Sequence, residues 1–263
     1  MLQIVNPAVL GGIIAIVVFC GIIVCLVVGR ALGQRAIRKA GATTVPNVGS
    51  LEAAVFALLG LLIAFTFSGA LNRFDVRRAQ GVDEANAIGT AYLRIDLLPA
   101  AAQPRLREAM RNYVDSRIAT YRMLPDVDAA QREAARSLKL QGDIWSQAVA
   151  ALRMPDSSPG VEIVMMPALN QMFDVTTVRL VATQIHPPRI VYLMLIGLAL
   201  VSALLAGYQT AGEKGYDWVH KIGFAAIVAF TIYVILDIEY PRLGLVRLDA
   251  IDQVLVDVRA SMN

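Results

Sequence analysis

One helical stripe holds the side chains best suited to moving ions. Its members recur at spacings of three and four residues: Val55, Leu59, Leu62, Thr66, Gly69, Arg73, Arg77, Gln80 and Glu84. At 100° per residue these positions fall on one side of a helix. The first five could line and gate a pore by dewetting, and the last four could form a charged vestibule that selects ions. The alternative is a packing seam in which Gly69 lets another helix approach closely, and the stripe alone leaves both interpretations open.

A second set of charged residues follows an apolar stretch near the carboxyl end. It contains Asp237, Glu239 and Arg242. A carboxylate at the edge of a membrane is costly unless it is paired. We therefore expect Asp237 to contact Arg73 or Arg77, either as a staple between helical hairpins or as part of a gate.

Residues for catalysis or metal binding are missing from the rest of the chain. There is no phosphate-binding glycine loop, no Gly-x-Ser-x-Gly and no Cys-x-x-Cys. Cys20 and Cys25 lie about 140° apart on a helix, and His186 and His220 are far apart in sequence. The sequence thus predicts no enzyme, no metal site and no cofactor, and a net charge of +3 does not favour nucleic-acid binding.

Long apolar stretches must position these residues. The chain is 57% hydrophobic and only 17% charged, against about 25% charged in soluble proteins. About 20 apolar residues cross a bilayer. Four stretches qualify, namely 8–28, 51–71, 190–206 and 220–238. We therefore predict two transmembrane hairpins, within residues 1–71 and 188–240.

Residues 72–187 are expected to form a helical extramembrane domain, followed by a tail over residues 241–263. The periodicity predicts helices over 105–123, 125–153 and 159–185. The second span should continue into this domain as far as Leu98, because only the isolated Gly81 and Gly89 interrupt it. The fold class is therefore all-α. Basic residues divide almost evenly between the two sides, so the side on which the domain lies is left open.

Two blocks of this sequence resemble a bacterial membrane family, the bestrophin-like domain family. The first begins with Leu-Leu-Gly-Leu-Leu-Ile-Ala-Phe-Thr-Phe-Ser-Gly-Ala at 58–70 and ends at Pro99, and the second is Asp237-x-Glu239-x-Pro241-x-x-Gly244. The positions that match the family pattern include Asn86, Gly89, Thr90, Arg94, Pro99, Pro241 and Gly244. In the second block Tyr240 stands where the family commonly has a basic residue.

This resemblance implies a function as well as a fold. Bestrophins are pentameric anion channels with four spans per subunit, a helical region between spans two and three, and a pore lined by span two. The resemblance implies a multi-pass homo-oligomer in the lipid bilayer of the bacterial inner membrane that conducts inorganic ions. The alternative is a non-conducting scaffold or sensor whose helical domain binds a partner protein.

Overall fold

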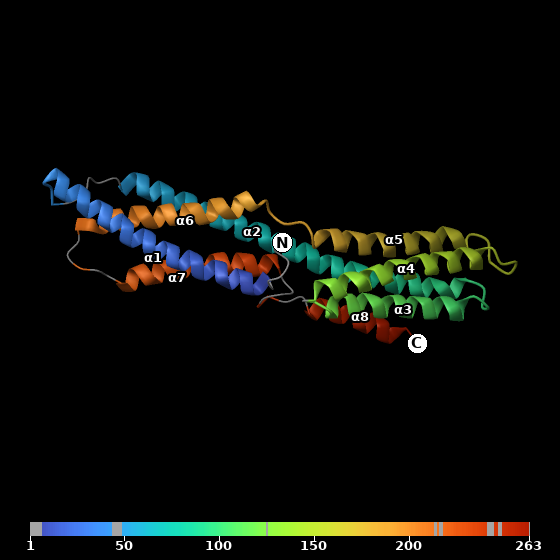
Figure 1. Cartoon of the computed structure of the whole chain (residues 1–263). Coiled ribbons are helices and arrows are strands. Elements are labelled where there is room, and N and C mark those ends of the chain that lie inside the picture. The colour runs from blue at the N-terminus through green and yellow to red at the C-terminus, as the bar shows by residue number, and fades with distance from the viewer. Residues whose placement is uncertain are drawn as a thin grey trace. The chain divides into compact units, whose positions relative to one another are not determined.

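The computed structural model describes residues 7–43, 49–124, 126–212, 215, 218–240, 245–246 and 249–262. These residues form helices and no strand (Figure 1). The α-helices are α1 Pro7–Ala40, α2 Gly49–Leu93, α3 Gln103–Arg122, α4 Val127–Leu152, α5 Val161–Ala182, α6 Arg189–Gln209, α7 Trp218–Glu239 and α8 Asp249–Ser261. Two short 3-10 helices are η1 Arg94–Leu97 and η2 Thr210–Gly212. The all-α class predicted from sequence is confirmed.

Four of these helices, α1, α2, α6 and α7, are long and apolar enough to cross a membrane. They contain the four apolar stretches expected from the sequence. Their arrangement as two hairpins around an inserted domain stays a prediction.

The chain divides into two compact units. Unit 1 comprises residues 1–73 and 186–240, and unit 2 comprises residues 74–185 and 241–263. Helix α2 contributes its apolar first part to unit 1 and its polar second part to unit 2.

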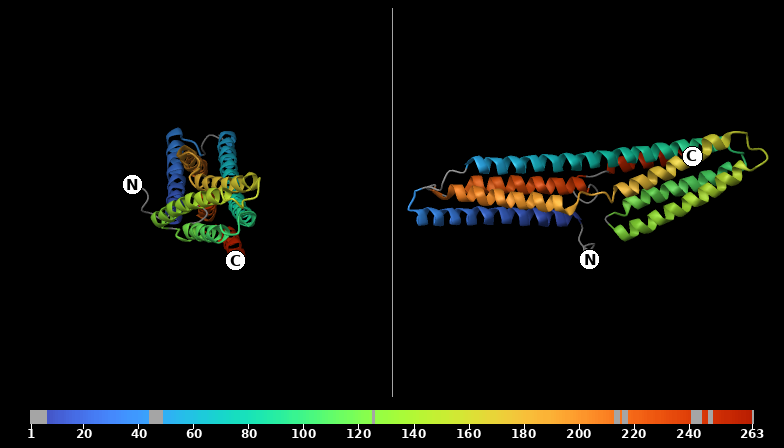
Figure 2. Two further views of the ribbon diagram at one scale, coloured as in Figure 1. Left: turned by 90° about the vertical axis from the view of Figure 1, so that its right-hand side faces the viewer. Right: turned by 90° about the horizontal axis from the view of Figure 1, so that it is seen from above.

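In unit 1, helix α1 packs against α6 and α7, and the three run side by side (Figures 1 and 2). Glycines permit the closest approach. A Cβ on Gly29 would overlap the Leu204 carbonyl, and one on Gly207 would overlap the Leu26 backbone. Helix α1 continues beyond the predicted apolar stretch 8–28 as far as Ala40.

In unit 2, α3 packs against α4 and α8, and α4 packs against α5. Its buried core includes Ile88, Ile95, Leu106, Met110, Tyr113, Ile144, Met165, Leu169, Met172 and Leu255. Burying each aliphatic side chain of this size contributes roughly 1.5–3 kcal/mol. The Tyr113 hydroxyl is satisfied inside this core by Thr176 Oγ1 at 2.7 Å and by the Gln141 amide at 3.2 Å.

The carboxyl-terminal residues contain an element that the sequence analysis assigned only as a tail. Helix α8 buries Leu255 completely and places Ile251 against Gly81 of α2, where a Cβ would overlap it.

The starts of α4 and α5 are explained by residues next to them in the sequence. The Asp126 side chain accepts a hydrogen bond from Ala129 N at 2.9 Å, as an N-cap does. Helix α5 begins after Gly160, which has a left-handed φ of 84°, and not at Pro159 as expected.

Candidate functional site

The apolar part of the predicted stripe is partly buried in unit 1. Leu59 is buried, whereas Val55, Leu62, Thr66 and Gly69 are half-buried. The Thr66 hydroxyl donates to its own helix, to Leu62 O at 2.8 Å and Ile63 O at 3.0 Å. Within one subunit, this burial favours the packing alternative for the stripe, and its role in gating stays a prediction.

The side of α2 next to this stripe is exposed in the chain. Leu58, Leu61 and Phe65 are 53%, 51% and 67% exposed. They recur at spacings of three and four residues, so they form a continuous apolar face. Within the described residues this face is therefore left largely uncovered.

Where the apolar part of α2 ends, Arg73 binds Glu239 at the end of α7. Arg73 Nη2 donates to Glu239 Oε2 at 2.7 Å, and Nε donates to the same oxygen at 2.9 Å. The Glu239 side chain is fully buried, and Gly69 leaves room for the guanidinium, whose Nη1 would lie 3.3 Å from a Cβ at that position. A charge-assisted contact of this kind holds two helices together more strongly than a neutral hydrogen bond.

A histidine completes this group on the other carboxylate oxygen. His186 Nδ1 lies 3.0 Å from Glu239 Oε1, and its ring stacks on Tyr240 with 4.7 Å between centroids. Glu239 was among the predicted charged residues, but Asp237 was expected as the partner of the arginine. Asp237 is buried on α7 and accepts a hydrogen bond from Tyr233 one turn earlier. His186 was missed as a contributor, although its place directly before a span was a usable signal.

Arg77 lies within unit 2 and caps a helix. Its Nε donates to Ala182 O at 3.2 Å and its Nη2 to Ile185 O at 3.1 Å. The carbonyls at the end of α5 have no partner within that helix, and a cation is favourable there because of the helix dipole. Arg77 is buried, so in a single subunit it faces no vestibule.

Glu84 lies at the centre of a buried charge cluster in unit 2, formed with Arg117, Tyr121, Arg179 and Asp252. Arg117 Nε donates to Glu84 Oε1 at 2.6 Å, Arg179 Nη1 donates to Oε2, and the Tyr121 hydroxyl donates to Oε2 at 3.2 Å. Arg179 Nη2 also donates to Asp252 Oδ1 of α8 at 3.0 Å. The guanidinium of Arg179 lies 3.9 Å from the centroid of the Tyr121 ring. We call these five residues the Glu84 cluster.

The charges of this cluster balance, which explains how it can be buried. Burial alone would raise the pKa of Glu84, but the positive charges of Arg117 and Arg179 outweigh burial and hold its pKa below the usual value. Burial also opposes the charged form of Arg117, yet neighbouring Tyr121 and Glu84 raise its pKa. The vestibule prediction does not suit Glu84, because its carboxylate is fully enclosed and paired. Arg117 falls at an apolar position of the predicted helix 105–123, which was the signal for its burial.

The remaining predicted positions are scattered over α2 and beyond. Gln80 is half-buried, Asn86 and Thr90 are exposed, and a Cβ on Gly89 would meet no atom within 4 Å. Arg94 donates to the Val164 carbonyl. Pro99 is buried in a turn, where its carbonyl accepts from Ala102 N at 2.9 Å. Pro241, Arg242 and Gly244 lie outside the described residues.

A comparison of the sequence with protein families decides to which family the chain belongs. The sequence profile of the Bestrophin-like domain matches residues 15–250. The chain belongs to the bestrophin-like family. No curated protein sequence matches it. The resemblance predicted from the two sequence blocks is therefore confirmed.

Solved structures of bestrophin homologues share the fold. One variant of a bacterial bestrophin homologue from Klebsiella pneumoniae superimposes with a TM-score of 0.66 at 12% identity, over 94% of this chain and 97% of that chain. Two other variants of that homologue give TM-scores of 0.62 and 0.61 at 12% and 14% identity, each over 94% of this chain and 98% of the other. At such identity the likeness concerns the fold. The family and the four apolar helices support a membrane location.

Proposed function

We propose that this bestrophin-like protein is the subunit of a homo-oligomeric ion channel, with α2 lining the conducting path. The observation that carries the proposal is the exposed apolar face of α2, formed by Leu58, Leu61 and Phe65, on a chain of bestrophin-like fold. The apolar part of the stripe, from Val55 to Gly69, lies on the neighbouring side of α2 and is buried or half-buried within unit 1. A pentamer in the bacterial inner membrane and a preference for anions follow from the family resemblance.

The distribution of charge along α2 supports two roles for this helix: gating by its apolar face and positioning by its charged residues. The exposed face carries no charge between Leu58 and Phe65, so an apolar ring there would gate by dewetting. Arg73, Arg77 and Glu84 are each held by a partner inside a subunit. Arg73 therefore fixes the end of the apolar part of α2 in unit 1, and Arg77 and Glu84 fix its polar part in unit 2.

Flux through purified protein tests conduction. The full chain in liposomes should pass chloride down a gradient, measured with a chloride-sensitive dye and by planar-bilayer recording. Vesicles that stay silent with every ion, voltage and pH would contradict the proposal. A monomeric silent protein by native mass spectrometry would support the alternative of a scaffold or sensor.

Cysteine accessibility tests which face of α2 meets water. In a background with Cys20 and Cys25 replaced by alanine, Leu61→Cys should react with a charged, water-soluble thiol reagent and lose conductance. Its neighbour Leu62→Cys, on the half-buried side, is the matched control and should react slowly. Faster reaction at position 62 than at 61 would reverse the assignment of faces and restore the stripe as the pore lining.

A further inference from the structure

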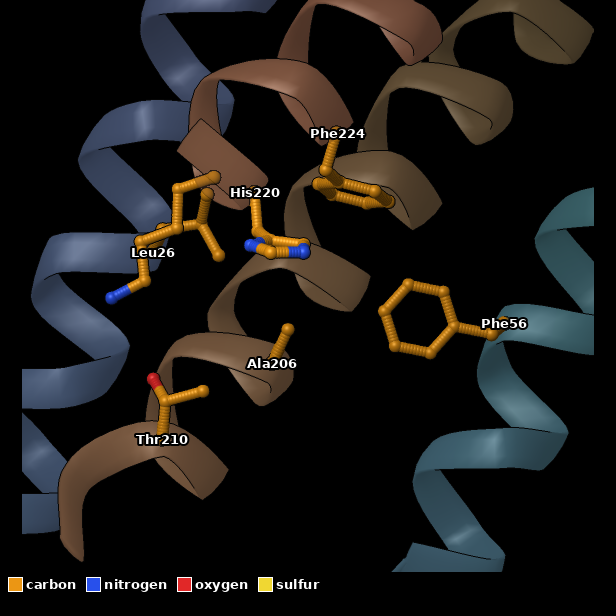
Figure 3. Close-up of a pocket in the computed structure, with 7 residues that line it drawn as sticks. Leu26, Phe56, Ala206, Thr210, His220 and Phe224 are labelled. Atoms are coloured by element: carbon orange, nitrogen blue, oxygen red, sulfur yellow. The ribbon is translucent and has the colours of Figure 1, made fainter. Parts of the chain in front are cut away.

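Unit 1 contains a partly open cavity of about 250 Å³ among α1, α2, α6 and α7. The apolar part of its lining consists of Leu26 of α1, Phe56 of α2, Ala206 of α6 and Phe224 of α7. Leu26 and Phe56 enter from helices on opposite sides of this space (Figure 3). The Phe56 and Phe224 rings meet edge to face, with 5.8 Å between centroids and 77° between planes. Each of the four helices therefore contributes one apolar side chain to the same cavity.

The polar side chains of the lining already have partners in the chain. These side chains are Thr210, His220 and Lys221. The Thr210 hydroxyl donates to Gly207 O, one turn earlier, at 3.0 Å, and His220 and Lys221 each take part in other interactions. Because these polar groups are engaged, a ligand in the cavity meets mainly the surface of the four apolar side chains.

Water suits such a cavity poorly. A water molecule takes about 30 Å³ in the liquid and needs two to four polar partners when it is buried. The cavity is large enough for several water molecules, but most of them would face carbon atoms. An engineered apolar cavity of about 150 Å³ stays dry and binds benzene. In proportion to its volume, the cavity of unit 1 would hold roughly ten carbon atoms.

Hydrocarbon of this length surrounds a membrane protein. The helices that form the cavity, α1, α2, α6 and α7, are those long and apolar enough to cross a membrane. Lipid acyl chains are the solvent of such helices across the core of the bilayer. Since the cavity is partly open, the end of a chain can enter it while the rest of the lipid stays outside.

We propose that this cavity binds the end of one phospholipid acyl chain. The chain lies against Phe56 and Phe224 and fills the space left by the short side chain of Ala206. The apolar and aromatic wall provides the contact, so the site does not select the charge of the head group. The proposal rests on the membrane location and is independent of whether the protein conducts ions.

Photocrosslinking of the full chain in phosphatidylcholine vesicles tests the proposal. A small fraction of the phosphatidylcholine carries a diazirine near the end of one acyl chain, and mass spectrometry locates the labelled residues after illumination. Phe56 and Phe224 should be labelled. Phe230, which is 64% exposed on α7, is the internal reference for contact with lipid outside the cavity. A probe with a phosphatidylglycerol head group should label Phe56 and Phe224 to the same extent, relative to Phe230.

Filling the cavity separates a bound chain from lipid that merely surrounds the helices. Ala206→Phe should lose most of the labelling of Phe56 and Phe224 relative to Phe230, and Ala206→Leu should lose less. Ala57→Phe is the matched control, because it adds the same ring at an exposed position next to Phe56 and should keep the wild-type ratio. The melting temperature in detergent shows that each variant is folded.

Three results would overturn the proposal. The first is a wild-type chain in which Phe56 and Phe224 are not labelled while Phe230 is. The second is an unchanged labelling ratio in both folded variants at position 206. The third is labelling by the phosphatidylglycerol probe alone, since the head group would then determine binding.

Discussion

Replacing Glu84 by glutamine should destabilise unit 2 strongly. The substitution keeps the shape of the side chain but leaves Arg117 and Arg179 buried without the carboxylate that both of them bind. Removing one partner of a buried ion pair costs about 3–5 kcal/mol. For a unit of this size, 1 kcal/mol corresponds to roughly 3–4 °C in melting temperature. We therefore expect Glu84→Gln to lower the melting temperature by roughly 10–20 °C.

Tryptophan fluorescence can follow unit 2 by itself. The chain has two tryptophans, and a Trp218→Phe background leaves Trp145 of α4, whose ring lies 6.4 Å from that of Phe173. Asp83→Asn is the matched control, since it removes an exposed carboxylate from the adjacent position of α2. If Glu84→Gln melted together with Asp83→Asn, the Glu84 cluster would not contribute as its geometry requires.

The same cluster predicts how stability depends on pH. The pKa of Glu84 is lowered in the folded protein, so the unfolded chain binds the proton more tightly. This contribution to stability is present in full above the unfolded pKa, about 4.3 for a glutamate. It is lost as the pH falls through the lower folded pKa. Below a pH of about 4 the wild type should therefore progressively lose its advantage over Glu84→Gln, and a constant difference down to a pH of about 2 would contradict this assignment.

Three further substitutions test other contacts in the wild-type chain. Gly207→Ala should lower the melting temperature in detergent, because overpacking costs about 1–3 kcal/mol. Gly60→Ala is the control and should leave it unchanged, because a Cβ at Gly60 meets no atom within 4 Å. Equal melting temperatures of the two variants would contradict the close approach of α1 and α6. Arg77→Met should speed amide exchange in the residues after α5 by leaving two carbonyls unbonded, and unchanged exchange would remove its capping role. Arg73→Lys should destabilise unit 1, measured by chemical denaturation, because one ammonium cannot reproduce the guanidinium's paired contacts with Glu239; wild-type stability would refute the importance of this geometry.

Long apolar stretches could be recognised without a structure because a membrane-crossing helix must satisfy its own backbone and face hydrocarbon. That requirement depends on local composition alone. It predicted α6 and α7 to within a few residues and the all-α class. Local rules failed where a residue's role depends on its neighbours. Asp237 was expected to contact Arg73 or Arg77, yet Arg73 binds Glu239, two residues further along α7.

The stripe on α2, with which the sequence analysis began, shows the same division. Its spacing placed Arg73, Arg77 and Glu84 on one side of a helix, but a spacing of 3.6 residues is equally compatible with a pore, a packing seam or a charged core. Tertiary contacts decided among them within the subunit: Arg73 binds Glu239, Arg77 caps α5, and Glu84 is enclosed by two arginines. These partners lie far away in sequence, and only folding brings them within hydrogen-bonding distance. Sequence therefore determined which side of α2 carries the charges, and the tertiary structure determined that those charges hold helices together.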